Sequence, residues 1–222
     1  MNAWCYRGCC AAAMIVLGGT SSPTEQREGS ARRLPPAVLK GDMSLEEAIA
    51  KRRSAREFGS GPLTEAQVAQ LCWAGQGITD TARMLRTVPS AGALYPIELY
   101  VVTAEGVDHY DPKRHVLSRH VVGEVRAGLQ RAALDQEAAG KAALCIVIAA
   151  EVQRSAHKYG SRAERYCFIE AGHVAQNLLL QATALKLTAV PIGAFADDEL
   201  AGLLKLPKAQ RALYIVAVGN RP

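Results

Sequence analysis

Three arginines and a serine lie within five consecutive positions in the first third of the chain. Arg52, Arg53, Ser54 and Arg56 follow a segment with helical spacing. Guanidinium groups pair bidentately with phosphate oxygens, and a short loop allows several of them to converge on one dianion. The same residues also suit a solvated basic helix end that complements the helix dipole. The cluster therefore predicts either a phosphate site or a plain helix terminus.

Two segments of small residues adjoin predicted strands. Pro89–Pro96 reads Pro-Ser-Ala-Gly-Ala-Leu-Tyr-Pro and leads into a strand, whereas Pro191–Phe195 ends another strand at Gly193 and Ala194. Small side chains allow a flat ligand to approach the backbone closely. An ordinary loop into an edge strand, or a plain exit from a strand, explains the same residues. Each segment alone leaves both interpretations open.

Lys158 and Tyr159 stand side by side just before Gly160, ahead of a long helical pattern. Adjacent amine and phenol groups can act as a general acid or base if one of them is desolvated. The alternative is a surface turn broken by the glycine.

Other kinds of site lack their motifs. His173 has no second metal ligand at helical spacing, which predicts a hydrogen-bonded core histidine and no metal site. Gly75-Gln76-Gly77 lacks the third glycine and the preceding strand of a dinucleotide fingerprint. The chain also has no Gly-x-Ser-x-Gly elbow of the hydrolase type.

The predicted helices must position these residues. Capping boxes at Ser44–Glu47 and Thr64–Gln67 predict one helix that ends near Arg52 and a second that stops at Gly75. Helical spacing predicts further helices over residues 123–136 and 162–186, and a small one that begins at Asp197.

The predicted strands alternate with those helices. Apolar runs predict strands over residues 99–103, 144–150, 188–192 and 213–218, and residues 108–117 predict a hairpin that turns at 111–114. No internal repeat interrupts this order. Strands and helices in this arrangement predict a single α+β domain.

Composition limits the class of protein. The chain has 222 residues, of which 49% are hydrophobic and 21% charged, and a net charge of +5. These values are typical of a globular domain, and the charge is too small and too dispersed for a nucleic-acid groove. Cys72, Cys145 and Cys167 lie in apolar patterns and predict buried thiols rather than a disulfide framework.

Residues 1–41 read as a leader and linker, and the domain is expected over 42–222. The apolar run over residues 9–19 is too short to span a bilayer, so we expect no stable membrane insertion. With Arg7 it fits the central region of a secretory signal, but no cleavage pattern follows it. Both a cytoplasmic and an exported location stay open. The polar stretch from Thr24 to Gly41 predicts a linker or an extended arm.

Taken together, the motifs resemble the nitroreductase superfamily. The resemblance rests on Arg-Arg-Ser-x-Arg-x-Phe at 52–58 and on Arg86-Thr87-Val88 leading into Pro89–Pro96. It continues through the hairpin residues 109–112 and through residues 158–160, 165–166 and 170–178, in the same order across 42–222. These segments look like the SagB-type dehydrogenase branch, which is related to the azoline oxidases of peptide natural products.

The resemblance implies an FMN-binding α+β homodimer whose central mixed or antiparallel sheet is flanked by helices, with flavin sites at the subunit interface. Arg52, Arg53, Ser54 and Arg56 would then hold the phosphate and ribityl end, with Arg221 as a late phosphate contact. Pro89, Ser90, Ala91 and Gly92 of the other subunit would line the isoalloxazine. Gly193 and Ala194 would present backbone amides near flavin N5, and Lys158 and Tyr159 would transfer a proton.

The resemblance leaves three functions open. The first is an FMN-dependent oxidoreductase that transfers hydride between flavin N5 and a small organic or peptide-derived substrate, such as an azoline ring. The second is an NAD(P)H-dependent nitro or quinone reductase. The third is a non-catalytic flavin-binding partner protein. None of the three implies nucleic acid as a partner.

Overall fold

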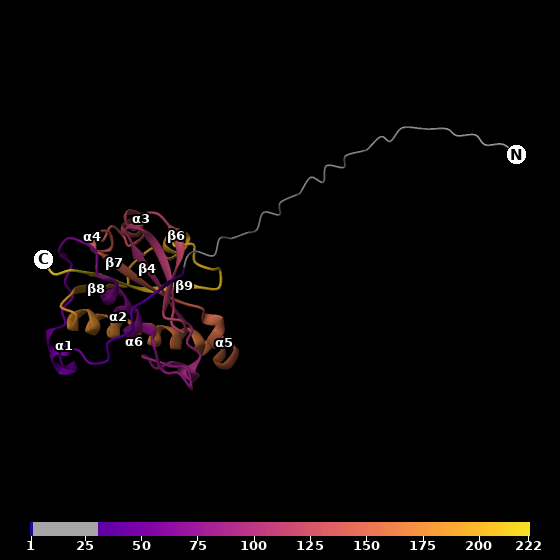
Figure 1. The fold of residues 1–222 in the computed structure, drawn as a ribbon, viewed down its shortest axis with the longest axis horizontal. Helices are drawn as coiled ribbons and strands as arrows, with labels where there is room; N and C mark the ends of the chain where they lie inside the picture. Colours follow the sequence, from indigo (N-terminus) through magenta and orange to yellow (C-terminus); the bar gives the residue numbers. More distant parts are fainter. Residues whose placement is uncertain (2–30) are drawn as a thin grey trace.

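A seven-stranded antiparallel sheet forms the centre of the protein, whose computed structural model describes Met1 and residues 31–222 (Figure 1). The strand order is β1–β6–β5–β4–β7–β9–β8, and each pair of neighbours runs antiparallel. A two-stranded ribbon, β2 with β3, stands apart from this sheet. The strands are β1 (Ala31–Arg33), β2 (Ile78–Asp80), β3 (Leu85–Arg86), β4 (Ile97–Thr103), β5 (Gly106–Asp111), β6 (Val116–Val122), β7 (Leu144–Ala150), β8 (Thr188–Ile192) and β9 (Arg211–Gly219).

Helices cover both faces of the sheet. On one face lie α1 (Leu45–Lys51), α2 (Glu65–Gln76) and the long α6 (Ala163–Ala184), and α5 (Val152–Tyr159) packs at the start of α6. The opposite face carries α3 (Arg126–Ala132), α4 (Glu137–Lys141) and α7 (Asp197–Leu203). Two single 3-10 turns, η1 (Ala91–Ala93) and η2 (Gly160–Arg162), complete the described elements. The chain is therefore an α+β domain with a large antiparallel sheet between two helical layers, as the sequence predicts.

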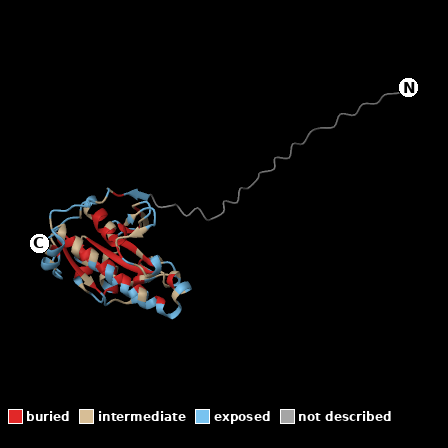
Figure 2. Ribbon diagram, turned by 90° about the horizontal axis from the view of Figure 1, so that it is seen from below, coloured by how far each residue is buried: buried red, intermediate tan, exposed pale blue. Residues whose placement is uncertain are grey.

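Strand β7 shows why the core has two halves. Side chains alternate between the faces of a strand, so Ile146 and Ile148 point to the core beneath α2 and α6, whereas Cys145 and Val147 point to the core beneath α3, α4 and α7. All seven residues of β7 are buried, in line with the unbroken apolar run of this segment. Figure 2 shows the same pattern, with buried residues along the strands and on the inner faces of the helices.

Local signals predict most helix starts. The Thr64–Gln67 capping box is complete, and Ser44 accepts a hydrogen bond from the Glu47 amide at 3.1 Å. The second half of the Ser44 box is not formed, because the Glu47 carboxylate pairs with Lys51 one turn later. Residue Asp197 begins α7 as predicted.

Four predictions about elements need correction. The segment 24–41, predicted to be a linker or an extended arm, is not a free linker throughout, because Ala31–Arg33 pair with β6 as strand β1 and Leu34 is buried in the core. The helix expected over 123–136 ends at Ala132, because Leu134 and Asp135 adopt positive φ, and α4 follows separately. The turn expected around Lys158 and Tyr159 is the last turn of α5. Helix α2 continues one residue past Gly75.

The structure also bears on membrane spans, metal sites and cysteine pairing in the described residues. Within residues 31–222, no helix is long and apolar enough to cross a bilayer, and no group of three or more His, Cys, Asp or Glu side chains could hold a metal ion. The thiols of Cys72, Cys145 and Cys167 are buried and unpaired in this part of the chain. The possible signal segment, with its cysteines, lies outside the described residues.

The segment after α1 is fixed against the end of the sheet. Ser54 bridges Ala189 of β8 in parallel fashion, and Gly59 bridges Asn220 just beyond β9. The Gly59 amide donates to the Asn220 carbonyl at 2.9 Å. A Cβ atom at Gly59 would lie 2.2 Å from the Arg221 carbonyl oxygen, so only glycine allows this approach. The contact holds residues 52–59 beside the C-terminal residues.

Replacing Gly59 by alanine is expected to destabilise the fold by about 1–3 kcal/mol, because the new methyl group meets backbone that cannot move aside. Urea denaturation measures the change. Gly202→Ala is the matched control: the position is exposed, helical and open, so alanine should be neutral or stabilise by up to about 1 kcal/mol. Equal stability of the Gly59 variant and the wild type would show that the bridge does not hold this segment.

Candidate functional site

The first group of predicted site residues surrounds a hollow at the edge strand β8. Arg52, Arg53 and Arg221 line a hollow of about 320 Å³, together with Thr188 and Ala189 of β8. Helix α1 ends at Lys51, and Arg52 leaves the helical conformation with ψ at 123°. The chain then runs along β8, where the Ala55 amide donates to the Ala189 carbonyl at 3.1 Å. Arginines from the start of the domain sequence and from its C-terminal end therefore border the same hollow.

Arg53 also caps the C-terminal end of α1, in line with the alternative interpretation of the cluster as a helix terminus. Its guanidinium donates to the carbonyl oxygens of Ala50 and Arg52 at 2.9 and 2.8 Å. Ser54 and Arg56 are exposed and do not line the hollow. The structure thus brings Arg52, Arg53 and Arg221 together and leaves Ser54 and Arg56 on the adjoining surface.

Gly193 and Ala194 lie at the other end of β8. Gly193 follows Ala189 by four positions, which is about 13 Å along a strand. Both residues are exposed, and Gln136 donates to the Ala194 carbonyl at 3.0 Å. A Cβ atom at Gly193 would lie 3.6 Å from the Tyr214 ring. Small residues at this strand end keep the backbone open to a ligand.

The second group of predicted residues is centred on Gly92. A Cβ atom there would lie 2.7 Å from the Tyr159 hydroxyl and 2.9 Å from the Lys158 ammonium nitrogen, and φ of Gly92 is +63°. Ala93 and Tyr95 also have positive φ, which costs about 1 kcal/mol or more for each non-glycine residue. The 89–95 loop is therefore strained, and it brings its smallest residue against the Lys158–Tyr159 pair.

Helix α5 and helix α6 together fix Lys158 and Tyr159. Gly160, with φ of +54°, ends α5 directly after Tyr159. The Tyr159 ring packs edge to face on Tyr166 of α6, with ring centroids 4.9 Å apart. The Lys158 nitrogen lies 5.5 Å from the centroid of the Tyr159 ring. The amine and the phenol are thus held next to each other at the start of α6.

The two groups lie at opposite ends of α6. Tyr166 contacts the second group, whereas Thr183 lines the hollow of the first group. Thr183 follows Tyr166 by seventeen positions of α-helix, which is about 25 Å. Figure 1 shows the same arrangement, with α1 and α5 toward opposite ends of α6. A single chain therefore does not bring the arginines and the Gly92 loop together.

A buried polar cluster lies under the Gly92 loop, and the sequence analysis did not identify it. Glu170 is 2% exposed and Gln76 is 1% exposed. Glu170 Oε1, Gln76 Nε2 and Thr87 Oγ1 have no hydrogen-bond partner among the described residues. Burial raises the pKa of Glu170 to about 7, although the Ser90 hydroxyl and the charge of Arg86 oppose the rise. No local motif signals such burial.

Comparisons with known proteins agree with this fold. The family model described as the nitroreductase family matches residues 49–220. A Methanocaldococcus jannaschii protein named "Putative nitroreductase MJ1384" is 41% identical over 186 residues, which cover 81% of this chain and 92% of that protein.

Two solved structures extend the likeness. A Ralstonia eutropha protein titled a "putative nitroreductase" superposes with a TM-score of 0.79 at 27% identity, over 86% of this chain and 90% of its own. The NADPH:FMN oxidoreductase of Vibrio harveyi, complexed with NAD+, has a TM-score of 0.61 at 23% identity, over 80% of this chain and 68% of its own. At this identity, the likeness to the Vibrio harveyi protein shows a shared fold and nothing more.

Fold, family model and relative together define a class of α+β oxidoreductases whose members generally bind FMN. The chain belongs to the nitroreductase family.

Glu170→Gln is expected to flatten the dependence of stability on pH. The raised pKa means that the folded state holds a proton that the unfolded state releases between about pH 4.5 and 7, so wild-type stability falls as pH rises through this window. Glutamine keeps the shape and cannot ionise, which should favour the variant by on the order of 1–3 kcal/mol at pH 8 relative to pH 5. Urea denaturation across this range measures the difference. Parallel pH profiles of variant and wild type would contradict the buried protonated carboxyl.

Proposed function

We propose that the protein is an FMN-dependent oxidoreductase of the SagB-type dehydrogenase kind, which oxidises a small organic or peptide-derived substrate. Family membership supports the oxidoreductase class and the cofactor. The observation that carries the finer proposal is the close approach of Lys158 and Tyr159 to Gly92, because it places an amine and a phenol beside a loop of small residues.

The residues of the β8 edge fit FMN. The phosphate is a dianion and needs fixed cations, which Arg52, Arg53 and Arg221 supply around one hollow. The flat ring system needs small neighbours, which Gly193 and Ala194 supply about 13 Å further along the strand. When bound, FMN supplies a reversible hydride acceptor.

A homodimer would complete the site. The Gly92 loop lies too far from the β8 edge of its own chain, but a two-fold rotation can bring the loop of one subunit to the β8 edge of another. The exposed side of α6 suits such a contact. Phe168 and Ile169 are about half exposed, and Gly172 on the same side faces open space, so a second helix could pack closely there.

Lys158 and Tyr159 are proposed to hold and move the proton of the reaction. Gly92 allows the loop to pack closely against the Tyr159 hydroxyl and the Lys158 nitrogen, since any side chain at that position would meet both atoms. The edge-to-face contact with Tyr166 orients the phenol. A substrate that lay against the small-residue loop would have both groups within reach.

A second function, NAD(P)H-dependent reduction of nitro compounds or quinones, uses the same site in the opposite direction. The names of the relatives favour it: the Methanocaldococcus jannaschii protein is named for nitroreduction, and the Vibrio harveyi structure holds NAD+. Both functions need the flavin, the arginine hollow and a donor or acceptor of protons.

Anaerobic mixing of the flavin-loaded protein with NADPH, NADH or a thiazoline model compound tests these functions. We expect the thiazoline compound to bleach the flavin absorbance in the wild type, and Lys158→Ala to keep its flavin but lose at least a hundredfold in the rate of bleaching. His157→Ala, at the adjacent exposed position of α5, is the control and should react normally. Bleaching by NADPH or NADH alone would favour the second function. Flavin that no compound reduces, or an undiminished rate in Lys158→Ala, would contradict the proposal.

A further inference from the structure

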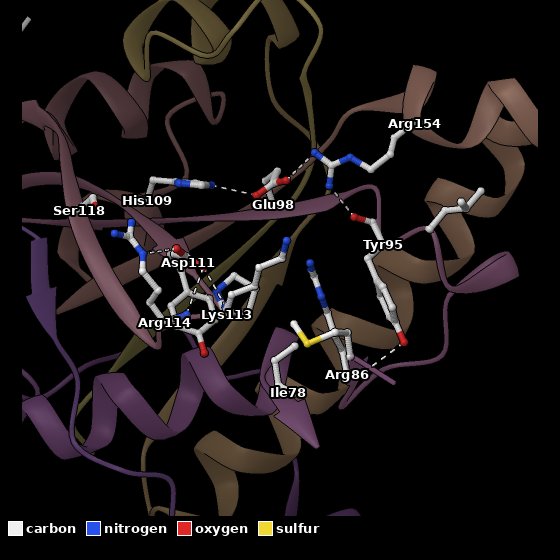
Figure 3. A pocket seen from close by; sticks show the side chains of 14 residues that line it. Ile78, Arg86, Tyr95, Glu98, His109, Asp111, Lys113, Arg114, Ser118 and Arg154 are labelled. Atoms are coloured by element: carbon white, nitrogen blue, oxygen red, sulfur yellow. Dashed lines mark hydrogen bonds and ion pairs between the residues drawn. The ribbon is translucent and has the colours of Figure 1, made fainter. Parts of the chain in front are cut away.

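A charged pocket lies next to the Gly92 loop, and none of the predicted site residues lines it. The pocket has a volume of about 650 Å³ and lies between the β2–β3 ribbon, the start of β4, the β5–β6 turn and α5 (Figure 3). We call it the Arg86 pocket; its walls include Arg86, Tyr95, Glu98, Lys113 and Arg154. Four Lys and Arg side chains and two carboxylates line it, so positive charge predominates.

Both carboxylates of the pocket are already neutralised. Glu98 accepts from Arg154 at 2.8 Å on one oxygen and lies 2.9 Å from His109 on the other. Asp111 accepts from Arg114 at 2.7 Å. These pairs use the charges of Arg154 and Arg114 within the wall of the pocket.

Arg86 and Lys113 form no ion pair among the described residues. In the part of the chain that the structure describes, neither side chain has a carboxylate within 4.0 Å. The Arg86 guanidinium stacks on the Tyr95 ring, 4.7 Å from its centroid, and donates one hydrogen bond, to Gln76 Oε1 at 2.6 Å. Figure 3 shows the Arg86 and Lys113 side chains pointing into the pocket.

An organic anion would complete this arrangement. A guanidinium carries five N–H donors, and leaving most of them unsatisfied in a half-buried position is unfavourable. Burial lowers the pKa of Arg86 from its ordinary value, with the charge of Glu98 opposing the change, so an anion in the pocket would relieve a real cost. Ile78, Met84 and Leu94 add apolar walls, which suit a ligand with a hydrophobic part.

The pocket is joined to the Lys158–Tyr159 pair by direct contacts. Arg154 precedes Lys158 by one turn of α5 and donates to the Tyr95 carbonyl at 2.6 Å. The Tyr95 amide in turn donates to Ser90 Oγ at 2.9 Å, within the loop that carries Gly92. A ligand anchored at Arg86 would therefore lie behind the same loop that faces the proposed flavin.

We propose that the Arg86 pocket binds the carboxylate of an organic substrate and directs its apolar part toward Lys158 and Gly92. The term substrate rests on the function proposed above, whereas the binding of a carboxylate does not. Charge-assisted bonds from Arg86, with the nearby charge of Lys113, provide the recognition.

Calorimetric titration of the flavin-loaded protein with 4-nitrobenzoate and with its neutral amide, 4-nitrobenzamide, tests the binding. We expect the carboxylate to bind at least tenfold more tightly than the amide, and Arg86→Gln to remove this preference. Lys113→Gln, at an exposed turn position where folding is not at risk, should weaken carboxylate binding severalfold. Arg83→Gln is the matched control, because this arginine of the same ribbon points to solvent and pairs with Asp80.

Two further arms identify the source of the carboxylate and its role. A short peptide with a free C terminus, compared with its amidated form, distinguishes a peptide carboxylate from that of a small molecule. In steady-state reduction of these nitro compounds with NADPH as the hydride donor, Arg86→Gln should raise KM for 4-nitrobenzoate at least tenfold and leave KM for 4-nitrobenzamide unchanged. Equal binding of acid and amide, or binding that Arg86→Gln and Lys113→Gln do not affect, would overturn the proposal that the Arg86 pocket binds a carboxylate. Selective binding without any effect on KM would overturn its role as a substrate anchor, even if the flavin chemistry holds.

Discussion

The length of α6 is the constraint on which the arrangement of the candidate site depends. Its buried side packs against the sheet and α2, so the helix cannot bend to bring its ends together. One end carries the contacts of Lys158 and Tyr159, and the other borders the hollow of Arg52 and Arg221. The distance of about 25 Å is too long for one flavin to use both ends within one chain. The proposed dimer follows from this separation, and the exposed side of the same helix offers the surface for it.

The 89–95 loop connects three features that would otherwise look unrelated. On one side Gly92 packs closely against Lys158 and Tyr159, and on the other the Tyr95 ring stacks with Arg86, which has no ion-pair partner among the described residues. Beneath the loop lies the carboxyl of Glu170, whose pKa burial raises to about 7. Positive φ at Ala93 and Tyr95 shows that the loop is held in a strained shape by this surrounding structure rather than by its own preference. Such rigidity is what a site for hydride and proton transfer requires.

Much of the fold could be predicted from the sequence, because its signals are local. Strand β7 is an unbroken apolar run, and the boxes at Ser44 and Thr64 mark the starts of α1 and α2. The pairing of β1 and the extent of α5 could not be predicted in this way, since both depend on partners distant in sequence. The same holds for the site. Motifs identified the arginines and the Lys158–Tyr159 pair, whereas the burial of Glu170 and the lack of an ion-pair partner for Arg86 among the described residues arise only from tertiary packing.

The central claim, that each flavin site draws on two subunits, is tested most directly by a mixed dimer. Arg52→Ala and Lys158→Ala chains with different affinity tags can be co-expressed, and the dimer carrying both tags can be isolated. Each parent should be nearly inactive, the first through loss of FMN and the second through loss of proton transfer. If the site is shared, one of the two sites in the mixed dimer has neither substitution, and turnover should return to about half the wild-type value per dimer. A mixed dimer no more active than its parents would place each site within a single chain and contradict the account.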